Sequence, residues 1–160
     1  MTLAYVALGS NLGDSAAQLR KALDELAHLR GSRLLRASSL YRTAPVGIRG
    51  QPDFINAAAV FETRLMPLEM LEELLSLEER FGRQRAFLHA PRTLDLDLLL
   101  HGGQVIDTPR LQLPHPRMHL RAFVLAPLLE IAPDCGIPGR GAASAWRTAT
   151  ALQRVDRLDA

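Results

Sequence analysis

Leucine and aspartate alternate at successive positions over residues 94–98, and this alternation constrains the fold more than any other segment. A period of two is typical of a β-strand, whose successive side chains point to opposite faces of the sheet. The leucines therefore share one face, and Asp95 and Asp97 share the other. The apolar run continues through Leu99 and Leu100, which favours a strand that is covered on both faces.

The two aspartates form a candidate cation site. Because a strand rises about 3.3 Å per residue, the Cα atoms of Asp95 and Asp97 should lie about 6.6 Å apart. Two carboxylates at this spacing can hold one or two hard cations, whereas without a cation their charges would repel each other. A solvated outer face of an edge strand is the alternative explanation for the pair.

Three arginines precede the aspartates along the chain, at positions 83, 85 and 92. Guanidinium groups beside metal-binding carboxylates suit a polyphosphate ligand, because cations and arginines together neutralise its charge. A loop whose charges are simply solvated is the alternative. The combination with Asp95 and Asp97 favours a phosphate site.

The remaining apolar patterns predict one domain spanning residues 1–160, with the order strand-helix-strand occurring twice. This order is typical of a ferredoxin-like α+β fold, a βαββαβ core with an antiparallel sheet and helices packed on it, here with additional short strands and C-terminal helices. Both core helices should cover one face of the sheet, which leaves the other face free for a ligand. The expected strands span 3–8, 33–40, 55–63, 94–100 and 105–106, a loop spans 41–53, and the expected helices span 15–31, 67–81, 121–131 and about 142–152.

Leucine spacing predicts the buried face of the first two helices. In the second helix, Glu78 lies three residues after Leu75 and continues the expected buried line. A glutamate in the last turn is opposed by the helix dipole, so we expect a polar partner, with a side chain reaching solvent as the alternative. The expected buried leucines are Leu19, Leu23, Leu26 and Leu29 in the first helix and Leu68, Leu71, Leu74 and Leu75 in the second.

Arg121 and Phe123 open the apolar helix expected over 121–131. A cation is poorly placed at a helix N-terminus, which favours a ligand or a carboxylate partner for Arg121. Phe123 could stack on a flat ring or pack in the core. The histidines at 28, 101 and 119 have no comparable polar neighbours, and we expect them at the surface.

The bulk composition narrows the function classes. The formal net charge of +2 is too small to indicate a nucleic-acid or membrane partner. A single cysteine, Cys135, excludes an internal disulfide and fits a reducing compartment, and the N-terminus lacks a signal peptide pattern. There is no GxxxxGK[ST], GxSxG, HExxH or paired CxxC motif. We therefore expect a cytoplasmic protein, a monomer, with small-molecule substrates.

Taken together, several short blocks resemble the 6-hydroxymethyl-7,8-dihydropterin pyrophosphokinase family of folate biosynthesis, and the resemblance covers nearly the whole chain. It implies a ferredoxin-like fold and transfer of the pyrophosphoryl group of ATP to the pterin hydroxymethyl oxygen, with release of AMP. The matching blocks are Gly9-Ser10-Asn11-Leu12, Ser39-Leu40-Tyr41-Arg42-Thr43, Gln51-Pro52-Asp53-Phe54-Ile55-Asn56-Ala57, Gly82-Arg83, Pro91-Arg92-Thr93-Leu94-Asp95-Leu96-Asp97, and the segment from Pro114-His115 to Phe123.

The resemblance also implies roles for individual residues. Asp95 and Asp97 would hold two Mg²⁺ ions along the triphosphate of ATP. Arg83 and Arg92 would contact the phosphates as catalytic groups, and Asn56 would hydrogen-bond the pterin edge. The remaining implied contacts are Thr43, Val46, Phe54 and Phe123 around the pterin, and Glu78, Arg85, Leu98, Arg110, Gln112, His115 and Arg121 around ATP.

The segment 83–90 departs from the family pattern and is the expected lid over the substrates. Members of the family often carry a basic residue and an aromatic residue just before the Pro-Arg element, where this chain has Leu88 and His89. Phe87 is the nearest apolar residue that could cover the site, and loops of this kind gate reactions by excluding water.

Two other functions remain open from the residues alone. Another two-metal enzyme on a similar fold, a nucleotidyltransferase or cyclase, also needs paired carboxylates but has no need for a flat-ring pocket. A non-enzymatic ligand- or RNA-binding module would use the open face of a ferredoxin-like sheet. RNA-binding modules on such a sheet need exposed aromatic side chains that stack on bases. This chain has five phenylalanines, two tyrosines and one tryptophan in all, which leaves few for that role.

Overall fold

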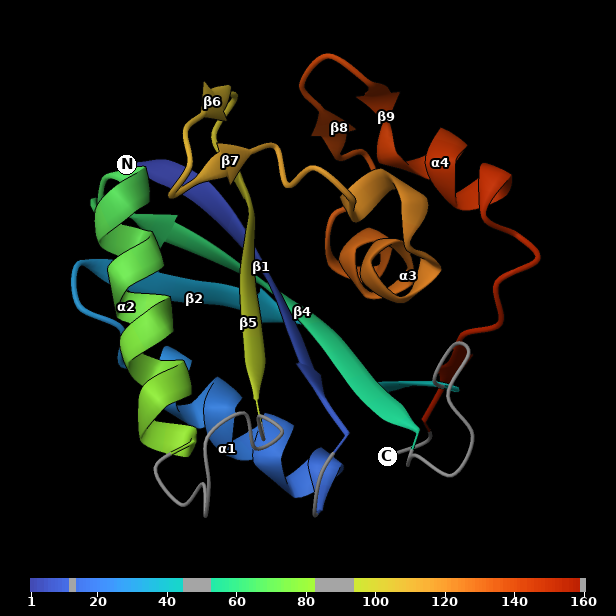
Figure 1. Cartoon of the computed structure of the whole chain (residues 1–160), viewed down its shortest axis with the longest axis horizontal. Helices are drawn as coiled ribbons and strands as arrows, with labels where there is room; N and C mark the ends of the chain where they lie inside the picture. Colours follow the sequence, from blue (N-terminus) through green and yellow to red (C-terminus); the bar gives the residue numbers. More distant parts are fainter. Residues whose placement is uncertain (12–13, 45–52, 83–93, 159–160) are drawn as a thin grey trace.

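The computed structural model describes residues 1–11, 14–44, 53–82 and 94–158 (Figure 1). Its sheet runs β10-β3-β4-β1-β5, with β2 pairing the other end of β4, and every pairing is antiparallel. The elements are β1 (Thr2–Ser10), α1 (Ser15–Leu26), β2 (Ser32–Ala37), β3 (Tyr41–Thr43), β4 (Phe54–Thr63), α2 (Pro67–Phe81), β5 (Asp95–His101), β6 (Ile106–Asp107), β7 (Gln112–Leu113), the 3₁₀-helix η1 (Met118–Leu120), α3 (Ala122–Ile131), β8 (Gly136–Ile137), β9 (Gly141–Ala142), α4 (Ala143–Ala149) and β10 (Asp156–Arg157).

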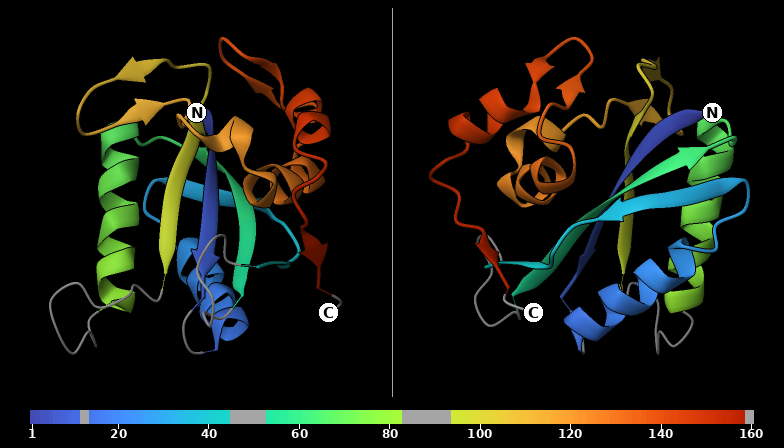
Figure 2. Two further views of the ribbon diagram at one scale, coloured as in Figure 1. Left: turned by 45° about the vertical axis from the view of Figure 1, so that its right-hand side comes forward. Right: turned by 180° about the vertical axis from the view of Figure 1, so that it is seen from behind.

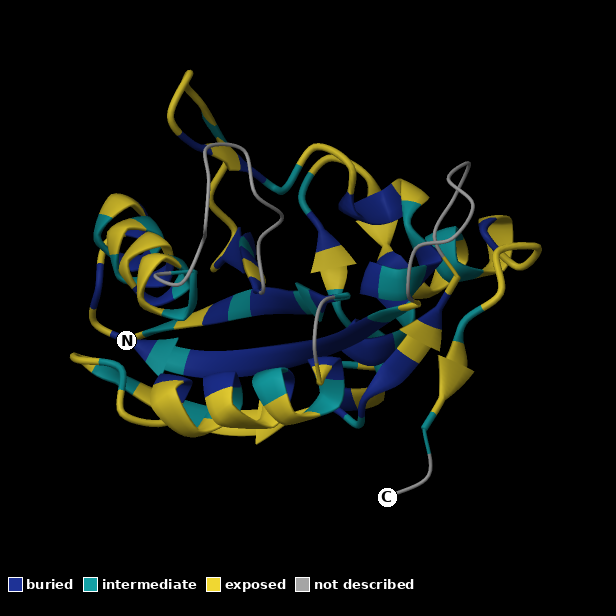
Figure 3. Cartoon of the chain, turned by 60° about the horizontal axis from the view of Figure 1, so that its bottom comes forward, coloured by how far each residue is buried: buried dark blue, intermediate teal, exposed yellow. Residues whose placement is uncertain are grey.

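The two faces of the sheet carry different helices. Helices α1 and α2 cover one face, and α3 with α4 lies over part of the other, as the views in Figure 2 show. The expected α+β arrangement is confirmed, and of the described elements α3 and α4 cover part of the second face and leave it open beside α3. Figure 3 shows buried residues along the central strands and exposed residues along the outer sides of the helices. A ligand site on the second face must therefore lie next to α3.

Strand β5 contains a bulge that explains its continuous apolar end. Its register with β1 shifts at Tyr5, so that Leu99 is an extra residue. A bulge changes the face of the sheet to which the following side chains point. Leu99 and Leu100 consequently both pack on the α3 side. His101 turns to the other face, where its Nε2 hydrogen-bonds the Leu65 carbonyl at 2.8 Å.

The expectation that His101 and His119 lie at the surface is wrong. Only 2% of His101 and 5% of His119 is exposed, whereas His28 is exposed as expected. The ring of His119 packs edge-on against Trp146 with centroids 4.7 Å apart. Local patterns do not reveal either environment, because the Leu65 carbonyl that binds His101 and the Trp146 ring that packs on His119 belong to residues distant in sequence.

Helix α2 begins and ends as expected, but the expected buried face is displaced. Leu74 is buried, whereas Leu68 and Leu75 are 45% and 44% exposed. The residues that face the core are Pro67, Met70, Leu74 and Leu77, which follow helical spacing as well as the leucines do. Two overlapping apolar stripes share Leu74 in this sequence, and packing against the sheet selects the stripe that contains Met70.

Helix α1 begins as expected, with the Asp14 carboxylate accepting a hydrogen bond from the Ala17 amide at 3.1 Å. It ends at Leu26 rather than at Gly31, and Gly31, with φ of +61°, serves the turn into β2. The segment 41–53, expected as loop, begins with strand β3, and residues 45–52 lie outside the described part. No helix in the described ranges is long and apolar enough to span a membrane.

Candidate active site

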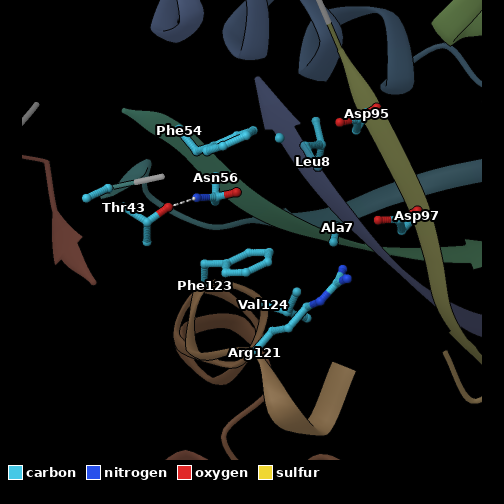
Figure 4. Close-up of a pocket in the computed structure, with 12 residues that line it drawn as sticks. Ala7, Leu8, Thr43, Phe54, Asn56, Asp95, Asp97, Arg121, Phe123 and Val124 are labelled. Carbon is cyan, nitrogen blue, oxygen red and sulfur yellow. Dashed lines mark hydrogen bonds between the residues drawn. The ribbon is translucent and has the colours of Figure 1, made fainter. Parts of the chain in front are cut away.

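Small residues on the central strand β1 leave a hollow in the sheet beside α3 (Figure 4). Gly9 of β1 lies directly between Asn56 of β4 and Asp95 of β5, and Ala7 lies opposite Asp97. Because Gly9 and Ala7 fill little space, a cavity of about 370 Å³ remains over them. The cavity volume is in the range of small-molecule sites. The two aspartates lie on the wall of this cavity.

Asn56 lies at the base of this cavity and has a fixed orientation. It is 4% exposed, and its Nδ2 donates a hydrogen bond to the Thr43 hydroxyl at 2.9 Å. Its amide oxygen points into the cavity in Figure 4. A Cβ atom on Gly9 would lie 3.2 Å from that oxygen, so glycine at position 9 keeps the Asn56 amide unobstructed.

Two aromatic rings face the cavity from different elements, Phe54 from β4 and Phe123 from α3 (Figure 4). The Arg121 guanidinium lies 5.5 Å from the centroid of the Phe123 ring and lines the same cavity. The arrangement forms a slot for a flat ring with one hydrogen-bonding group at its base. Stacking on both faces of such a ring is favourable because aromatic surfaces bury a large area with defined geometry.

The start of α3 is held by a residue from the C-terminal segment. The Gln153 side chain accepts a hydrogen bond from the Ala122 amide at 2.9 Å and donates one to the Leu120 carbonyl at 2.9 Å. These two backbone groups flank Arg121. The described ion pairs do not include Arg121, so the carboxylate partner that we considered from its sequence position is not seen among the described residues.

A second hollow of about 440 Å³ lies between β5, α2 and the segment around β7. Asp95 and Asp97 line both hollows, so the acidic pair stands where the two meet. The exposed Leu75 and the partly buried Leu71 of α2 line the second hollow. Of the residues expected around ATP, this hollow brings together Glu78, Leu98, Arg110, Gln112 and His115, whereas Arg121 lines the first hollow.

Glu78 has the polar partner that its position predicted. Its Oε2 accepts a hydrogen bond from the Leu96 amide at 2.7 Å. Among the described strands β5 lies at the edge of the sheet, so no described strand pairs with this amide on that side. Glu78 therefore fixes the backbone between the two aspartates from the last turn of α2.

His115 lies beside the acidic pair as a neutral imidazole. Its backbone amide donates to the Leu99 carbonyl at 2.9 Å, and its Nδ1 accepts from the Arg117 amide at 3.2 Å, which leaves the ring proton on Nε2. Burial lowers the pKa of His115, assisted by the charges of Arg121 and Arg117 and opposed by Asp97. A neutral donor faces the hollow at physiological pH.

Two other residues of the second hollow have protein partners. Arg110 pairs with Glu72 at 3.2 Å, and the Gln112 amide donates to Asp107 at 3.3 Å. Both contacts are at the exposed surface, where such pairs contribute little free energy. A ligand could therefore displace them at low cost.

Four expected site residues, Arg83, Arg85, Arg92 and Val46, lie outside the described residues, and so does the expected lid over 83–90. Their contributions stay predictions.

The donor set fits a hard cation that also binds phosphate. In the described ranges no cluster of three or more His, Cys, Asp or Glu side chains could hold a metal by itself. Mg²⁺ does not need such a cluster, because it is commonly bound by one or two carboxylates together with substrate phosphates and water. Asp95 and Asp97 supply two carboxylates on one face of β5, at the meeting point of both hollows.

The sequence patterns missed the residues that create space. Among the sequence-based expectations Gly9 stands only within the block Gly9-Ser10-Asn11-Leu12, and Ala7 has no role. The sequence does show two small residues at alternate positions of a strand, and their shared face is opposite the one that α1 and α2 cover. Leu75, expected in the core, is exposed along the second hollow, whereas Leu71 packs partly buried against the core and also lines that hollow.

Comparisons with known proteins agree with this geometry. The family model for 7,8-dihydro-6-hydroxymethylpterin-pyrophosphokinase (HPPK) matches residues 5–133. A 2-amino-4-hydroxy-6-hydroxymethyldihydropteridine pyrophosphokinase of Haemophilus influenzae is 46% identical over 138 residues, 86% of each chain. A protein of the same name from Pseudomonas aeruginosa is 44% identical over 154 residues, which cover 96% of this chain and 95% of that protein.

The fold is also found among solved structures. The crystal structure of Plasmodium falciparum HPPK-DHPS wild type with pteroate matches with a TM-score of 0.75 and 14% identity. The match covers 92% of this chain but only 42% of that longer chain. At this identity the likeness shows the fold, while the family model and the curated relatives carry the assignment. The chain belongs to the 7,8-dihydro-6-hydroxymethylpterin-pyrophosphokinase family.

Proposed function

We propose that this protein transfers the pyrophosphoryl group of ATP to the hydroxymethyl oxygen of 6-hydroxymethyl-7,8-dihydropterin. In this reaction the hydroxyl oxygen attacks the β-phosphorus, the bond between that phosphorus and the oxygen bridging to the α-phosphorus breaks, and AMP leaves. The hydroxyl proton is released. The family assignment supports this activity, and the observation that supports its location is that two hollows share Asp95 and Asp97.

The pterin belongs in the hollow over Gly9. Its bicyclic ring would stack between Phe54 and Phe123, and the fixed Asn56 amide would hydrogen-bond its polar edge. Thr43 contributes by holding the Asn56 amide in place. A slot of this kind favours a flat heterocycle with donors and acceptors on one edge, because an analogue without them would leave Asn56 unpaired.

ATP belongs in the hollow between β5 and α2. The exposed Leu75 and the partly buried Leu71 would contact the base, and Arg110 and His115 would reach polar groups of the nucleotide. The triphosphate would then run past Asp95 and Asp97 toward the pterin hydroxyl. This path places the β-phosphorus between the two hollows.

Asp95 and Asp97 would hold two Mg²⁺ ions along the triphosphate. Bound there, the ions would neutralise phosphate charge and orient the transferred group. Arg121 lines the pterin hollow beside Phe123 and is positioned to offset negative charge at the transferred group. Arg83 and Arg92 would add to this charge compensation, with Arg92 as the stronger candidate.

Product analysis tests the proposal. The purified protein should form AMP when incubated with ATP, Mg²⁺ and the hydroxymethyl dihydropterin, and it should form none without the pterin. Formation of ADP would indicate transfer of one phosphoryl group, and formation of free pyrophosphate would indicate the nucleotidyl-transfer alternative. Either product in place of AMP would contradict the proposal.

A further inference from the structure

Glu130 occupies the last turn of α3, the helix that carries Phe123 near its start. A carboxylate at a helix C-terminus is destabilised by the helix dipole, so hydrogen-bond donors are needed to hold it in one orientation. The segment that leads into β3 supplies them. The Ser39 amide donates to Oε2 at 3.0 Å, the Ser39 hydroxyl donates to the same oxygen at 3.2 Å, and the Tyr41 hydroxyl donates to Oε1 at 2.6 Å.

The ionisation states of Glu130 and Tyr41 are consistent with the hydrogen bond between them. The hydrogen bonds from Tyr41 and Ser39 and the charge of Arg157 lower the pKa of Glu130 although partial burial opposes them. Burial and the hydrogen bond to Glu130 raise the pKa of Tyr41 to about 12. At neutral pH Glu130 is therefore ionised and the Tyr41 hydroxyl keeps its proton, which makes the bond charge-assisted.

Tyr41 connects this contact to the floor of the pterin hollow. It lies directly opposite Asn56 in the pairing of β3 with β4. Two residues further along β3, Thr43 accepts the hydrogen bond that orients the Asn56 amide. The same segment is held to β4 at Ser38, whose hydroxyl accepts from the Ala58 amide at 2.8 Å. Glu130 thus joins the element that carries Phe123 to the element that orients Asn56.

We propose that Glu130 is a positioning residue that sets the spacing between Phe123 and the Thr43–Asn56 pair. The inference rests on the proposed function, since it assigns the slot between these residues to the pterin. No contact between Glu130 and the substrate is required. The residue acts through Tyr41 and Ser39 on one side and through helix α3 on the other.

The contact is not needed to keep α3 on the sheet. The helix packs on the second face through the buried side chains Val124, Leu125, Leu128 and Ile131. These apolar contacts are non-directional, so they hold the helix against the sheet without fixing its position relative to β3. The hydrogen bonds of Glu130 supply that directional constraint.

The test compares substrate affinities in Glu130→Ala and Tyr41→Phe, with Glu79→Ala as the matched control. Glu79 is an exposed glutamate in the last turn of α2 and lines neither hollow. Loss of the charge-assisted bonds should raise the KM for the pterin about tenfold in Glu130→Ala and about threefold in Tyr41→Phe. The KM for ATP should change by less than about twofold in both variants, and the control should match the wild type.

Two further measurements separate positioning from a loss of folding or of the proposed activity. The side-chain amide signals of Asn56 in a ¹⁵N spectrum of the ligand-free protein should shift in both variants and stay in place in the control. The double variant should be no worse toward the pterin than Glu130→Ala alone, because both changes remove the same contact. Tyr41→Phe keeps the buried ring and serves as the test if Glu130→Ala folds poorly.

Equal increases in both KM values, multiplicative effects in the double variant, or unmoved Asn56 signals would each overturn the inference. Absence of AMP formation by the wild type would instead contradict the proposed function. The Asn56 signals would still test the link from Glu130 to Asn56 in that case.

Discussion

At the residue scale, Asp95 and Asp97 are the side chains on which the proposed reaction depends most. Asp95→Ala and Asp97→Ala should each lower kcat by about 10²- to 10³-fold, because a cation ligand is lost where each metal contributes several kcal/mol to the reaction. Removal of one of two like charges relieves the repulsion between them. AMP formation at saturating Mg²⁺ is the measurement, with the exposed Asp24→Ala as the control. A near-normal rate in either variant would remove the metal-binding role.

Gly9→Ala tests the shape of the pterin hollow without removing a polar group. In Gly9→Ala the new methyl group would lie 3.2 Å from the Asn56 amide oxygen, so the amide must shift. Asn56→Ala removes the amide altogether and should weaken pterin binding by about 1–3 kcal/mol, while Gly9→Ala should cost a smaller amount in the same direction. Titration calorimetry with the pterin and with an ATP analogue measures both.

Gly103→Ala is the control for this pair, because an added methyl group there meets nothing within 4 Å. If Asn56→Ala weakened ATP and pterin binding equally, Asn56 would have a structural role. Unchanged pterin affinity in Gly9→Ala would mean that the Asn56 amide is free to move aside.

At the scale of elements, Glu78 links helix α2 to strand β5. Its Oε2 accepts from the Leu96 amide at 2.7 Å, so Glu78→Ala should leave that amide exposed to solvent or unpaired. Hydrogen exchange at Leu96 should then speed up by about tenfold or more, and Glu78→Gln, which keeps an acceptor oxygen, should show a smaller change. Unchanged exchange in Glu78→Ala would show that β5 holds its position without α2.

Helix boundaries were predictable where a proline or a glycine marks them in the sequence. Pro67 and Gly82 delimit α2 as expected, since proline suits a first helical turn and glycine a helix end. The orientation of the same helix was not predictable, because two apolar stripes pass through Leu74 and only the sheet decides between them. The dipole argument that predicts a polar partner for Glu78 in α2 applies equally to Glu130 in the last turn of α3, but no partner was predicted for Glu130.

The candidate site was predictable to the extent that its residues lie on regular strands. The alternation around Asp95 and Asp97 predicted their shared face, and the pairing with β1 confirms it. The sequence could not show that the pair would border two separate hollows, because the second hollow depends on where α2 places Leu71 and Leu75. The roles of individual residues toward ATP and the pterin stay predictions.

At the scale of the whole molecule, the buried histidine His119 makes stability depend on pH. Burial and the charge of Arg140 lower the pKa of His119 from its ordinary value of 6.5. Below that value the unfolded chain binds a proton that the folded protein resists, so stability should fall as the pH drops from about 6.5 toward the lower folded-state pKa. Urea unfolding at about pH 7 and about pH 5.5 should show the loss.

His119→Phe keeps a ring against Trp146 and should reduce this pH dependence. The exposed His28→Gln is the control and should leave it unchanged. His115 also has a pKa lowered by burial, so part of the dependence should persist in His119→Phe. An identical pH profile for His119→Phe and the wild type would assign the dependence to other groups.

The position of β5 at the end of the sheet has a consequence for self-association. An open sheet edge presents free backbone groups on which another chain can form a strand, and charged side chains on or over the edge discourage this. Here the Glu78 carboxylate already occupies the Leu96 amide, and a second copy arriving edge to edge would have to displace it. The approaching strand would also bring a second pair of aspartates against Asp95 and Asp97. The same acidic residues that suit a cation between two substrates thus also discourage copies of the protein from joining along β5.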